Sequence, residues 1–485
     1  MPDQKSARLI FEYPGTIAAT RLLPADDCSG SSLADVLGHN NLRSQRPDLP
    51  DLAENKVVRH YTALAQKNYG VDSGPYPLGS CTMKYNPKVH EELSALPGFA
   101  GIHPLQLPDD VQGCLKLMAL LEEQLCAICG VSRMTFQPAA GAQGELTGLL
   151  MIGAWHRSRG DDRRRVIIVP DSAHGTNPAS AAMAGFEVRE IRSGPDGLID
   201  LDALRGALDN RTAGLMMTCP NTLGLFEKDI RIIADLVHEA GGLLYYDGAN
   251  INAILMQARP GDMGFDIVHL NLHKSFGTPH GGGGPGAGPV GVAAFLEPFL
   301  PVPVVSRRSD GQLFLDEDRP RSIGRMRAFH ANFSILVRAF AYILANGAQG
   351  LREVSETAVT NAVYLQNRLR EAYELPFDRQ CLHEFVLSAG KLKAFGCSAM
   401  DVAKRLIDYG FHPPTVYFPL TIKEALMIEP TETEDRESLD ALADALLAIA
   451  REAETQPDLL REAPHGTPVS RPDELRAARQ TILRY

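Results

Sequence analysis

Strand and helix patterns alternate along the chain from about residue 110 to residue 270. Short apolar runs, several of them β-branched, predict strands that are buried on both faces. These strands are expected at Val166–Val169, Glu187–Ile191, Gly214–Thr218, Leu243–Tyr246 and Ile267–Leu270. Apolar residues at helical spacing predict helices at Val111–Cys129, Glu145–Arg157, Asp200–Leu208 and Arg231–Ala240. The alternation indicates an α/β fold with a mostly parallel sheet covered by helices on both sides.

The segments on either side of this region have different patterns. The first hundred residues are only weakly periodic, with a helix expected at Asp51–Asn68 and a loop at Tyr76–Lys88. After the proline-rich stretch Pro298–Pro303, a smaller α+β domain is predicted. Its elements are expected at Phe333–Ala345, Glu353–Tyr373, Glu384–Leu387, Ala399–Tyr409, Ala425–Ile428 and Arg436–Thr455. We therefore predict an N-terminal arm (1–108), a large α/β domain (109–330), a small C-terminal α+β domain (331–462) and a tail (463–485).

Composition and charge exclude several classes of protein. Of the 485 residues, 44% are hydrophobic and 22% are charged, as in an ordinary globular protein. The net charge of −11 disfavours general binding of nucleic acid, because phosphates are repelled on average. The sequence shows neither an apolar run of about 18 residues, as a membrane span needs, nor a signal-peptide pattern at Met1–Glu12. We expect a cytoplasmic protein that binds neither nucleic acid nor membranes.

The eight cysteines are sparse, and several lie inside apolar runs. This usage fits free thiols in a reducing compartment better than a disulfide framework. Cys126 and Cys129 form a C-x-x-C, but no second pair has the spacing of a zinc site. We therefore expect two packed thiols on a helix, and no metal site.

Polar residues follow the carboxyl ends of four predicted strands. The four clusters are Asp171–Pro178, with His174 and Thr176; Cys219–Gly224, with Asn221; Asp247–Asn250, with Ala249; and Asn271–Ser275, with His273 and Lys274. In open parallel sheets, ligands bind beyond these strand ends. Each cluster alone is weak evidence, but together they predict one site at one edge of the sheet.

Lys274 is the candidate nucleophile of this site. It follows an apolar strand and precedes a loop of small residues, so burial would lower its pKa and free the amine to attack an aldehyde. A surface lysine at a strand end is the alternative. Asp247 favours the first interpretation, because its carboxylate suits a protonated pyridine nitrogen and Ala249 leaves room for the ring. A helix cap or turn is the alternative for Asp247.

Two histidines and one helix start are further candidates. The ring of His174 can stack on the other face of a pyridine, and His273 is a candidate general base or ring-edge contact. A loop or packing histidine is the alternative for each. Gly141, Ala142 and Gln143 lie in a small-residue segment that opens a helix, where backbone N–H groups can approach a phosphate.

Four long motifs resemble those of the P-protein family of the glycine cleavage system. They are Tyr76–Pro87 (YPLGSCTMKYNP), Ala173–Ser180 (AHGTNPAS), Pro220–Glu227 (PNTLGLFE) and Asn271–Gly282 (NLHKSFGTPHGG). Ala463–Ser470 is similar as well, and the resemblance covers about residues 50 to 475. The family consists of glycine dehydrogenases (aminomethyl-transferring). The resemblance implies the aspartate-aminotransferase fold, which is fold type I of pyridoxal-phosphate enzymes, with a seven-stranded type of sheet.

The resemblance also implies a cofactor, an activity and partners. The cofactor is pyridoxal 5′-phosphate, bound to Lys274 as a Schiff base. The implied cofactor-binding residues are Lys274, Asp247, Ala249, His174, Gly141, Ala142, Gln143, Asn221 and Thr176. Enzymes of the family decarboxylate glycine, release CO2 and transfer the aminomethyl group to the lipoyl arm of H-protein. Because the chain has about half the length of the long family form and carries the lysine motif, it resembles subunit 2 of the split form. Subunit 1 is then the expected partner, in an α2β2 assembly.

Substrate contacts and alternative functions complete the sequence-based picture. Ser80, Thr82 and Lys84 are candidates for binding glycine, and a solvated lysine is the alternative for Lys84. His103, Arg325 and Arg327 are further candidates. The chain departs from the family at residues 26–32 and at Cys219, where we expect Asn. Two other functions stay open: a different glycine-using fold-type-I transferase or aldolase, and a non-catalytic partner subunit.

Overall fold

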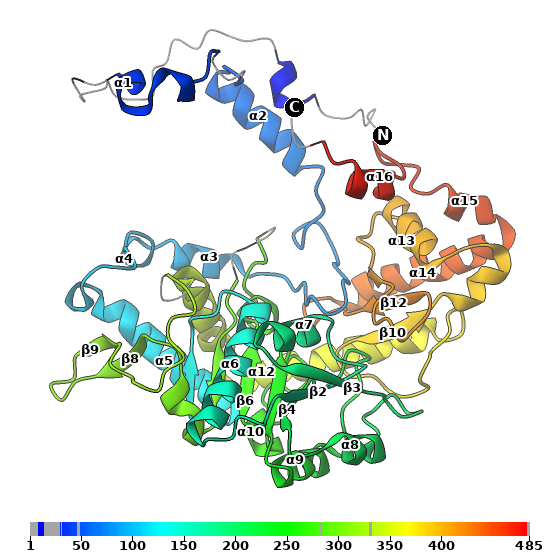
Figure 1. Cartoon of the computed structure of the whole chain (residues 1–485). Helices are drawn as coiled ribbons and strands as arrows, with labels where there is room; N and C mark the ends of the chain where they lie inside the picture. The colour runs from blue at the N-terminus through cyan, green and yellow to red at the C-terminus, as the bar shows by residue number, and fades with distance from the viewer. Residues whose placement is uncertain are drawn as a thin grey trace. The chain divides into compact units, whose positions relative to one another are not determined.

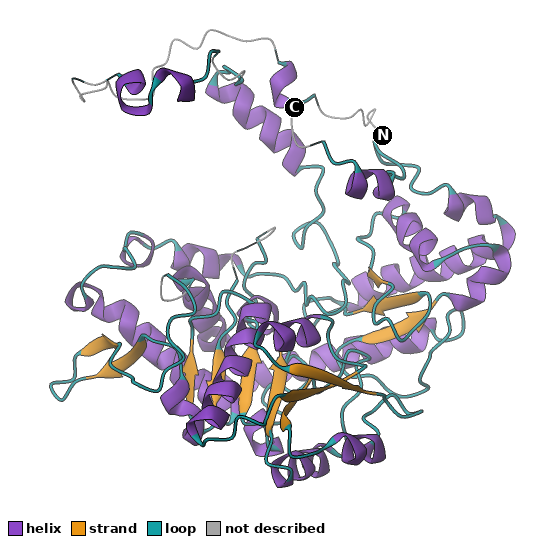
Figure 2. Ribbon diagram, viewed as in Figure 1, coloured by secondary structure: helices purple, strands orange, loops and turns teal. Residues whose placement is uncertain are grey.

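Within the described part of residues 71–464, a seven-stranded sheet forms the centre of the computed structural model (Figures 1 and 2). The strands are β1 (Arg133–Thr135), β2 (Val166–Pro170), β3 (Glu187–Ile191), β4 (Thr212–Met217), β5 (Leu243–Gly248), β6 (Ile267–Leu270) and β7 (Val290–Val292). Their order is β1-β7-β6-β5-β4-β2-β3. The strands from β2 to β6 pair in parallel, and β7 runs antiparallel to both of its neighbours. The mostly parallel α/β sheet predicted from the sequence is confirmed.

Helices cover both faces of this sheet, because alternate strand residues point to opposite sides. In β5, Leu244 and Tyr246 belong to a core that includes residues of α5 (Gln112–Cys129), α9 (Ile230–Glu239) and the first part of α12 (Phe333–Leu369). Leu243 and Tyr245 belong to a second core, which includes residues of α6 (Gly141–Ser158). Every residue of β5 is buried. Its nearly continuous apolar pattern arises because neither face of the strand meets water.

The second part of α12 belongs to a smaller core. Sequence patterns predict two helices between residues 333 and 373, and α12 does contain two helical segments, separated by a kink at the non-helical Gly347 (φ +60°). This core also contains residues of α13 (Ala399–Asp408) and α14 (Arg436–Thr455). They pack with an antiparallel sheet of β10 (Phe385–Ser388), β12 (Ala425–Ile428) and β11 (Thr415–Val416). Leu78 forms a bridge to Ile428, which brings the segment of residues 78–84 to the end of β12.

Several short elements were not predicted. They are α3 (Lys88–Ser94), α4 (Pro97–Ala100), α7 (Thr176–Met183), α10 (Pro260–Met263), α11 (Leu272–Ser275), α15 (Pro457–Arg461) and the hairpin of β8 (Val304–Arg307) and β9 (Leu313–Asp316). The helix expected at Asp200–Leu208 is α8 (Leu201–Ala207). The start of α6 lies at Gly141, four residues before the predicted Glu145. Gln143 explains this difference, because its Oε1 accepts a hydrogen bond from the N–H of Ala139 and closes the turn before the helix.

The seven cysteines within the described residues are free thiols. Burial raises the pKa of Cys126 to about 12 and also raises the pKa of Cys129. Cys129 is buried and Cys126 is half-buried on α5, as expected for packed thiols.

The structure describes residues 8–13, 30, 32–45, 49–281, 284, 286–328 and 332–482. Residues 1–70 and 465–485 form a separate compact unit, whose described helices include α1 (Leu33–Leu37), α2 (Glu54–Ala65) and α16 (Glu474–Arg479). The helix expected at Asp51–Asn68 is α2. Most of the departure at residues 26–32 lies outside the described residues, and the predicted domain boundaries stay predictions. In the described part of the chain, every helix lacks the length or the apolar character that a membrane span requires.

Candidate active site

A cleft lies at the carboxyl ends of β2, β4, β5 and β6. Predicted site residues that line it are Ser80, Gly141, Ala142, His174, Thr176, Asn221, Asp247, Ala249 and Lys274. Other residues of its wall are Glu145, Thr218, Pro220, Thr222, Asn250, Asn271, His383 and Glu384. Parallel strands direct the residues that follow them to one edge of the sheet. The structure therefore brings together nine of the side chains or backbone positions that sequence reasoning proposed for one site.

Lys274 lies on the short helix α11, directly after β6, and is half-buried. Its Nζ donates a hydrogen bond of 2.6 Å to the carbonyl oxygen of Ser80. Ser80 has a positive φ of +66°, and Thr82 has a φ of +51°. Such left-handed backbone is costly for residues other than glycine and is concentrated at functional sites. The backbone of residues 78–84 is thus held in an unfavourable conformation that places the carbonyl of Ser80 beside Lys274.

Asp247 lies at the end of β5 and is 4% exposed. Burial alone would raise its pKa, but nearby His269 and two N–H donors outweigh burial and hold the pKa below its ordinary value. The donors are the side-chain amide of Asn177, at 2.8 Å, and the backbone N–H of Ala249, at 3.1 Å. Nε2 of His269 lies 3.3 Å from Oδ1 of Asp247. Asp247 is therefore a buried, ionised carboxylate at the floor of the cleft.

His174 lies in the loop between β2 and α7. Burial lowers its pKa, so the ring is neutral near pH 7. Its Nδ1 lies 2.9 Å from the hydroxyl of Thr176, which donates a hydrogen bond of 2.7 Å to Oε1 of Glu145. The other oxygen of Glu145 accepts a hydrogen bond from the hydroxyl of Ser180, also at 2.7 Å. This chain of contacts fixes the His174 ring and identifies Glu145, which was not predicted, as the residue that holds the loop to α6.

The start of α6 forms one wall of the cleft. A Cβ on Gly141 would lie 2.9 Å from Nδ2 of Asn271, so a larger residue would displace that side chain. Thr218 Oγ1 and Asn271 Oδ1 are buried and lack a hydrogen-bond partner among the described residues. Buried polar atoms rarely stay unpaired. A polar ligand near the start of an 18-residue helix would supply their partners and would gain from the N–H groups there.

Three predicted residues are engaged elsewhere. Nε2 of Gln143 donates to the carbonyl of Met326, so its side chain braces a loop. Lys84 is buried rather than solvated, and its Nζ lies 2.6 Å from Oε1 of Glu432. Burial, and then the nearby His280, lower the pKa of His273 to about 3, which makes this ring a weak base at neutral pH. These side chains support the site or lie behind it, outside the lining.

The remaining candidates are also placed by the structure. Thr82 is buried, with its N–H donating to Oε2 of Glu429 at 3.1 Å. Asn221 lines the cleft, but its side chain stabilises its own loop: Nδ2 donates to the carbonyl of Gly197, and Oδ1 accepts from two backbone N–H groups. Arg325 pairs with Glu317 on the surface. The candidates His103 and Arg327 are outside the lining of the cleft.

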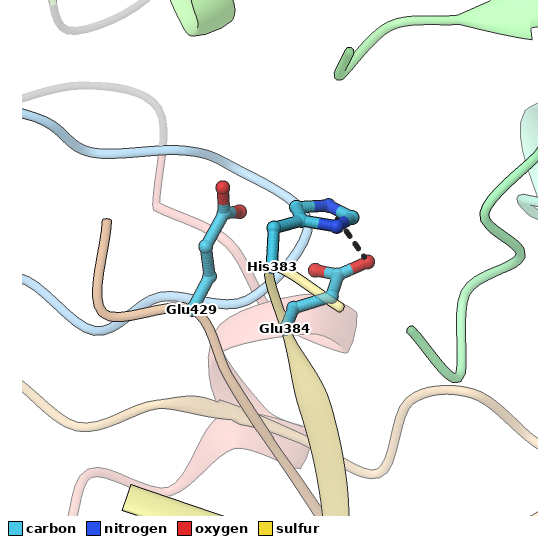
Figure 3. Close-up of side chains that lie close together, drawn as sticks. All are labelled: His383, Glu384 and Glu429. Atoms are coloured by element: carbon cyan, nitrogen blue, oxygen red, sulfur yellow. Dashed lines mark ion pairs between the residues drawn. The ribbon is translucent and has the colours of Figure 1, made fainter. Parts of the chain in front are cut away.

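Sequence reasoning missed His383 and Glu384, which line the cleft, and Glu429, which lies beside them (Figure 3). His383 and Glu384 stand at the start of β10, and Glu429 directly follows β12. All three flank strands of the small antiparallel sheet. The available signal was a pair of glutamates at the ends of two apolar strands, which by itself is typical of many surface turns.

Comparison with known proteins identifies the family. The family model for the glycine dehydrogenase C-terminal domain matches residues 354–465, and the aminotransferase class-V model matches residues 149–283. A probable glycine dehydrogenase (decarboxylating) subunit 2 from Caldanaerobacter subterraneus subsp. tengcongensis is 59% identical over 98% of each chain. The chain belongs to the glycine dehydrogenase (decarboxylating) subunit 2 family. Another member, from Bacillus licheniformis, is 55% identical over 100% of this chain and 99% of its own.

Solved structures confirm the fold. A glycine decarboxylase (P-protein) of the glycine cleavage system in inhibitor-bound form superposes with a TM-score of 0.72 and 23% identity, covering 86% of this chain and 95% of that one. A TDC from Oryza sativa, solved with PLP and tryptamine, gives a TM-score of 0.65 at 14% identity, over 85% and 90% of the two chains. The fold type I expected for this member of the glycine dehydrogenase family is confirmed.

The residues of the cleft fit pyridoxal phosphate. An amine, a buried carboxylate and a neutral imidazole line the same cleft, contributed by Lys274, Asp247 and His174. The small residues Gly141 and Ala142 begin α6, whose N–H groups suit a phosphate. The unpaired oxygens described above supply further polar contacts. Cys219, the departure from the family pattern, is buried behind this wall, between the lining residues Thr218 and Pro220.

Proposed function

We propose that this chain decarboxylates glycine with pyridoxal 5′-phosphate, releases CO2 and passes the aminomethyl group to the lipoyl arm of H-protein. The observation that carries the proposal is the meeting of Lys274, Asp247 and His174 in one cleft of a chain whose relatives at 55–59% identity are named glycine dehydrogenase (decarboxylating) subunit 2. A non-catalytic subunit would need a different explanation for a lysine and an ionised aspartate facing the same space. A glycine-using aldolase of the same fold would share these residues, and the names of the relatives favour decarboxylation over it.

The cleft residues divide the work of holding the cofactor. Lys274 would hold its aldehyde carbon through Nζ, and Asp247 would keep a proton on the ring nitrogen. His174 and Ala249 would lie against the two faces of the ring. The phosphate would take the N–H groups at Gly141 and Ala142, with Thr176 nearby. Bound there, the cofactor supplies a sink for the electron pair that remains when CO2 departs.

The chain's own groups are arranged for this role before any ligand binds. Asp247 keeps its negative charge at neutral pH, because its pKa is held below the ordinary value by His269, Asn177 and Ala249 despite burial. His174 stays uncharged, because burial lowers its pKa. The carbonyl oxygen of Ser80 accepts a hydrogen bond of 2.6 Å from Nζ of Lys274 and would hold the free amine in the cleft. Of the three candidates for binding glycine, Ser80 lines the cleft whereas Thr82 and Lys84 do not, which favours Ser80 as a substrate contact.

The assembly is part of the same proposal. Relatives named subunit 2 support a partner, subunit 1, and we propose an α2β2 heterotetramer that meets lipoylated H-protein in the cytoplasm. Co-expression with subunit 1, followed by measurement of the native mass of the complex, tests the stoichiometry. A stable homodimer that does not bind subunit 1 would contradict the proposed heterotetramer.

Lys274→Ala tests the catalytic proposal. The wild-type protein, with subunit 1 and H-protein, is expected to release CO2 from glycine and to exchange it with labelled bicarbonate, and Lys274→Ala is expected to do neither. Borohydride reduction of the yellow wild-type protein should fix the label on residue 274, as peptide mapping would show. Surviving CO2 release in Lys274→Ala would overturn the assignment. A protein that stays colourless with added pyridoxal phosphate would favour the non-catalytic alternative.

A further inference from the structure

His383, Glu384 and Glu429 form a buried cluster at the wall of the cleft. The three residues are 2%, 5% and 0% exposed, and one ligand atom of each lies within 4.8 Å of the others. Figure 3 shows the His383 ring and the Glu384 carboxylate side by side at the start of β10, with Glu429 approaching from the end of β12. Two carboxylates this close, this deeply buried, repel each other strongly when both are ionised.

Hydrogen bonds tie the cluster to the loop that contacts Lys274. Oε2 of Glu384 accepts from the N–H of Ser80 at 2.8 Å, and the carbonyl of the same Ser80 accepts from Nζ of Lys274. One residue therefore connects the glutamate and the lysine. Both oxygens of Glu429 are also engaged, one by the N–H of Thr82 at 3.1 Å and the other by the amide of Asn250 at 2.7 Å.

The fourth oxygen, Oε1 of Glu384, has different surroundings. It lies 3.6 Å from Nε2 of His383, which is longer than a hydrogen bond. Both ring nitrogens of His383 lack a hydrogen-bond partner within the described chain, although the ring is buried. N–H donors occupy one position on each of three carboxylate oxygens, which leaves their second lone pairs and Oε1 of Glu384 open to a proton or an ion. A proton between the two carboxyl groups leaves every one of these contacts in place.

The charges that face the pair agree with one shared proton. Burial and then the neighbouring Glu429 raise the pKa of Glu384 well above its ordinary value, and burial raises the pKa of Glu429 to about 7. The positive groups facing the pair are Lys274 and Lys84, and both act to lower the pKa of Glu429. Cys81 also faces the pair, and burial raises its own pKa, so it stays a neutral thiol. Burial lowers the pKa of His383 to about 3, so this ring is neutral as well.

We propose that Glu384 and Glu429 share one proton and that Glu384, the member of the pair that lines the cleft, donates it to the carbon from which CO2 leaves. This inference rests on the proposed function. As the carbon–carboxyl bond breaks, CO2 departs and the electron pair stays on the α-carbon. The proton of Glu384 then forms the new C–H bond. Both carboxylates are left ionised beside Lys274 and Lys84, and a proton from solvent in the cleft restores the pair.

The first test detects the protonated carboxyl group directly and does not depend on enzyme activity. Infrared spectroscopy of the wild-type holoenzyme near pH 7 should show the C=O stretch of a protonated carboxyl group that is lost in Glu384→Gln and that disappears at a lower pH in Glu429→Gln than in the wild type. Glutamine keeps an oxygen that can accept the backbone N–H, and circular dichroism checks the fold. Glu434→Gln is the matched control, because burial raises the pKa of Glu434 to about 7 at the start of α14, where it does not line the cleft. A carboxyl band that persists in Glu384→Gln, or that disappears at the same pH in Glu429→Gln as in the wild type, would overturn the shared proton.

The second test measures the proton transfer. Glu384→Gln should lower glycine-dependent CO2 exchange about 100-fold or more, the usual scale of general acid catalysis, while glycine still changes the visible spectrum of the holoenzyme. In Glu429→Gln, Glu384 loses its negative neighbour and its pKa falls, so the alkaline limb of the pH–rate profile should move to lower pH. Glu434→Gln should leave both readouts unchanged.

Three results distinguish the shared proton from the proposed function and from a metal site. Exchange that is undiminished in Glu384→Gln, in an assay where the wild type is active, overturns the inference and leaves the proposed function intact. A wild type that never releases CO2 from glycine overturns the proposed function, whatever the infrared spectra show. Stoichiometric binding of Zn²⁺ or Mn²⁺ alone, abolished by Glu384→Gln, would assign the cluster to a metal and overturn the shared proton.

Discussion

Lys84 offers a test of how the loop of residues 78–84 is held. Its side chain is 1% exposed, and Nζ lies 2.6 Å from Oε1 of Glu432, whose side chain is 8% exposed. Nζ also donates to the side-chain oxygen of Asn252 and to the carbonyl of Ser275, both at 3.0 Å. Lys84→Met preserves most of the volume of the side chain but removes the charge, and leaves the Glu432 carboxylate buried beside a thioether.

The expected loss follows from the burial of the pair. Breaking a buried, hydrogen-bonded ion pair from one side costs about 3–5 kcal/mol, because the remaining charge has no compensation. Lys88→Met provides the control. Lys88 lies four residues further on and also pairs at 2.6 Å, with Asp72, but the two side chains are 56% and 59% exposed. Solvent screens that pair, so its loss should cost less than about 1 kcal/mol.

Urea unfolding followed by circular dichroism, with the fluorescence of the single tryptophan as a second probe, measures both variants. Lys84→Met combined with Glu432→Gln should recover much of the stability lost by Lys84→Met, since no unpaired charge then remains. If Lys84→Met costs no more than Lys88→Met, or if the double variant shows no coupling, the reasoning is refuted. A raised KM for glycine at unchanged stability would instead support Lys84 as a substrate contact.

Three other predictions follow from the packing and charges of the fold. Asp247→Asn should lower kcat for CO2 release about 100-fold or more at saturating cofactor, because an amide cannot replace a preorganised buried charge; a near-normal kcat would contradict the role of Asp247. Gly148→Ala should cost ~1–3 kcal/mol in thermal or urea unfolding, because its Cβ would lie 2.2 Å from Cε2 of Tyr245; an unchanged midpoint would show that the ring moves freely. Cys126 and Cys129 should resist iodoacetamide at pH 8 and react in urea, because burial raises the pKa of each thiol; equal labelling by mass spectrometry in both conditions would argue against burial.

The pattern of apolar residues was sufficient to predict the bounds of elements with a clear hydrophobic periodicity. The predicted bounds of β6, β12 and α14 agree with the structure because each is a short apolar run or a long amphipathic helix. The strands β1 and β7 have three residues each, too few to show any period. The two helices predicted between residues 333 and 373 are present within α12, where the non-helical Gly347 separates them.

The site divides in the same way. Lys274, Asp247 and His174 could be predicted because parallel strands deliver their following residues to one edge, whatever the details of packing. Glu384 and Glu429 could not, since they flank strands of a second sheet, and only the tertiary structure shows Glu384 lining the cleft with Glu429 beside it. Lys84 was predicted to contact either solvent or substrate, because it lies in a polar loop. The tertiary structure shows instead that it is buried and paired with Glu432.

The hydrogen bond between Ser80 and Glu384 has a consequence for biosynthesis, because its partners are 304 positions apart in the chain. At the 5–20 residues per second of translation, roughly 15–60 s separate the appearance of the loop from that of the glutamate that anchors it. During this interval the loop lacks the glutamate that holds it, and the chain from β1 to β7 is made before Glu384 appears. The cleft therefore closes only after nearly the whole polypeptide has left the ribosome, and a truncated product would keep the sheet but lack one wall of its pocket.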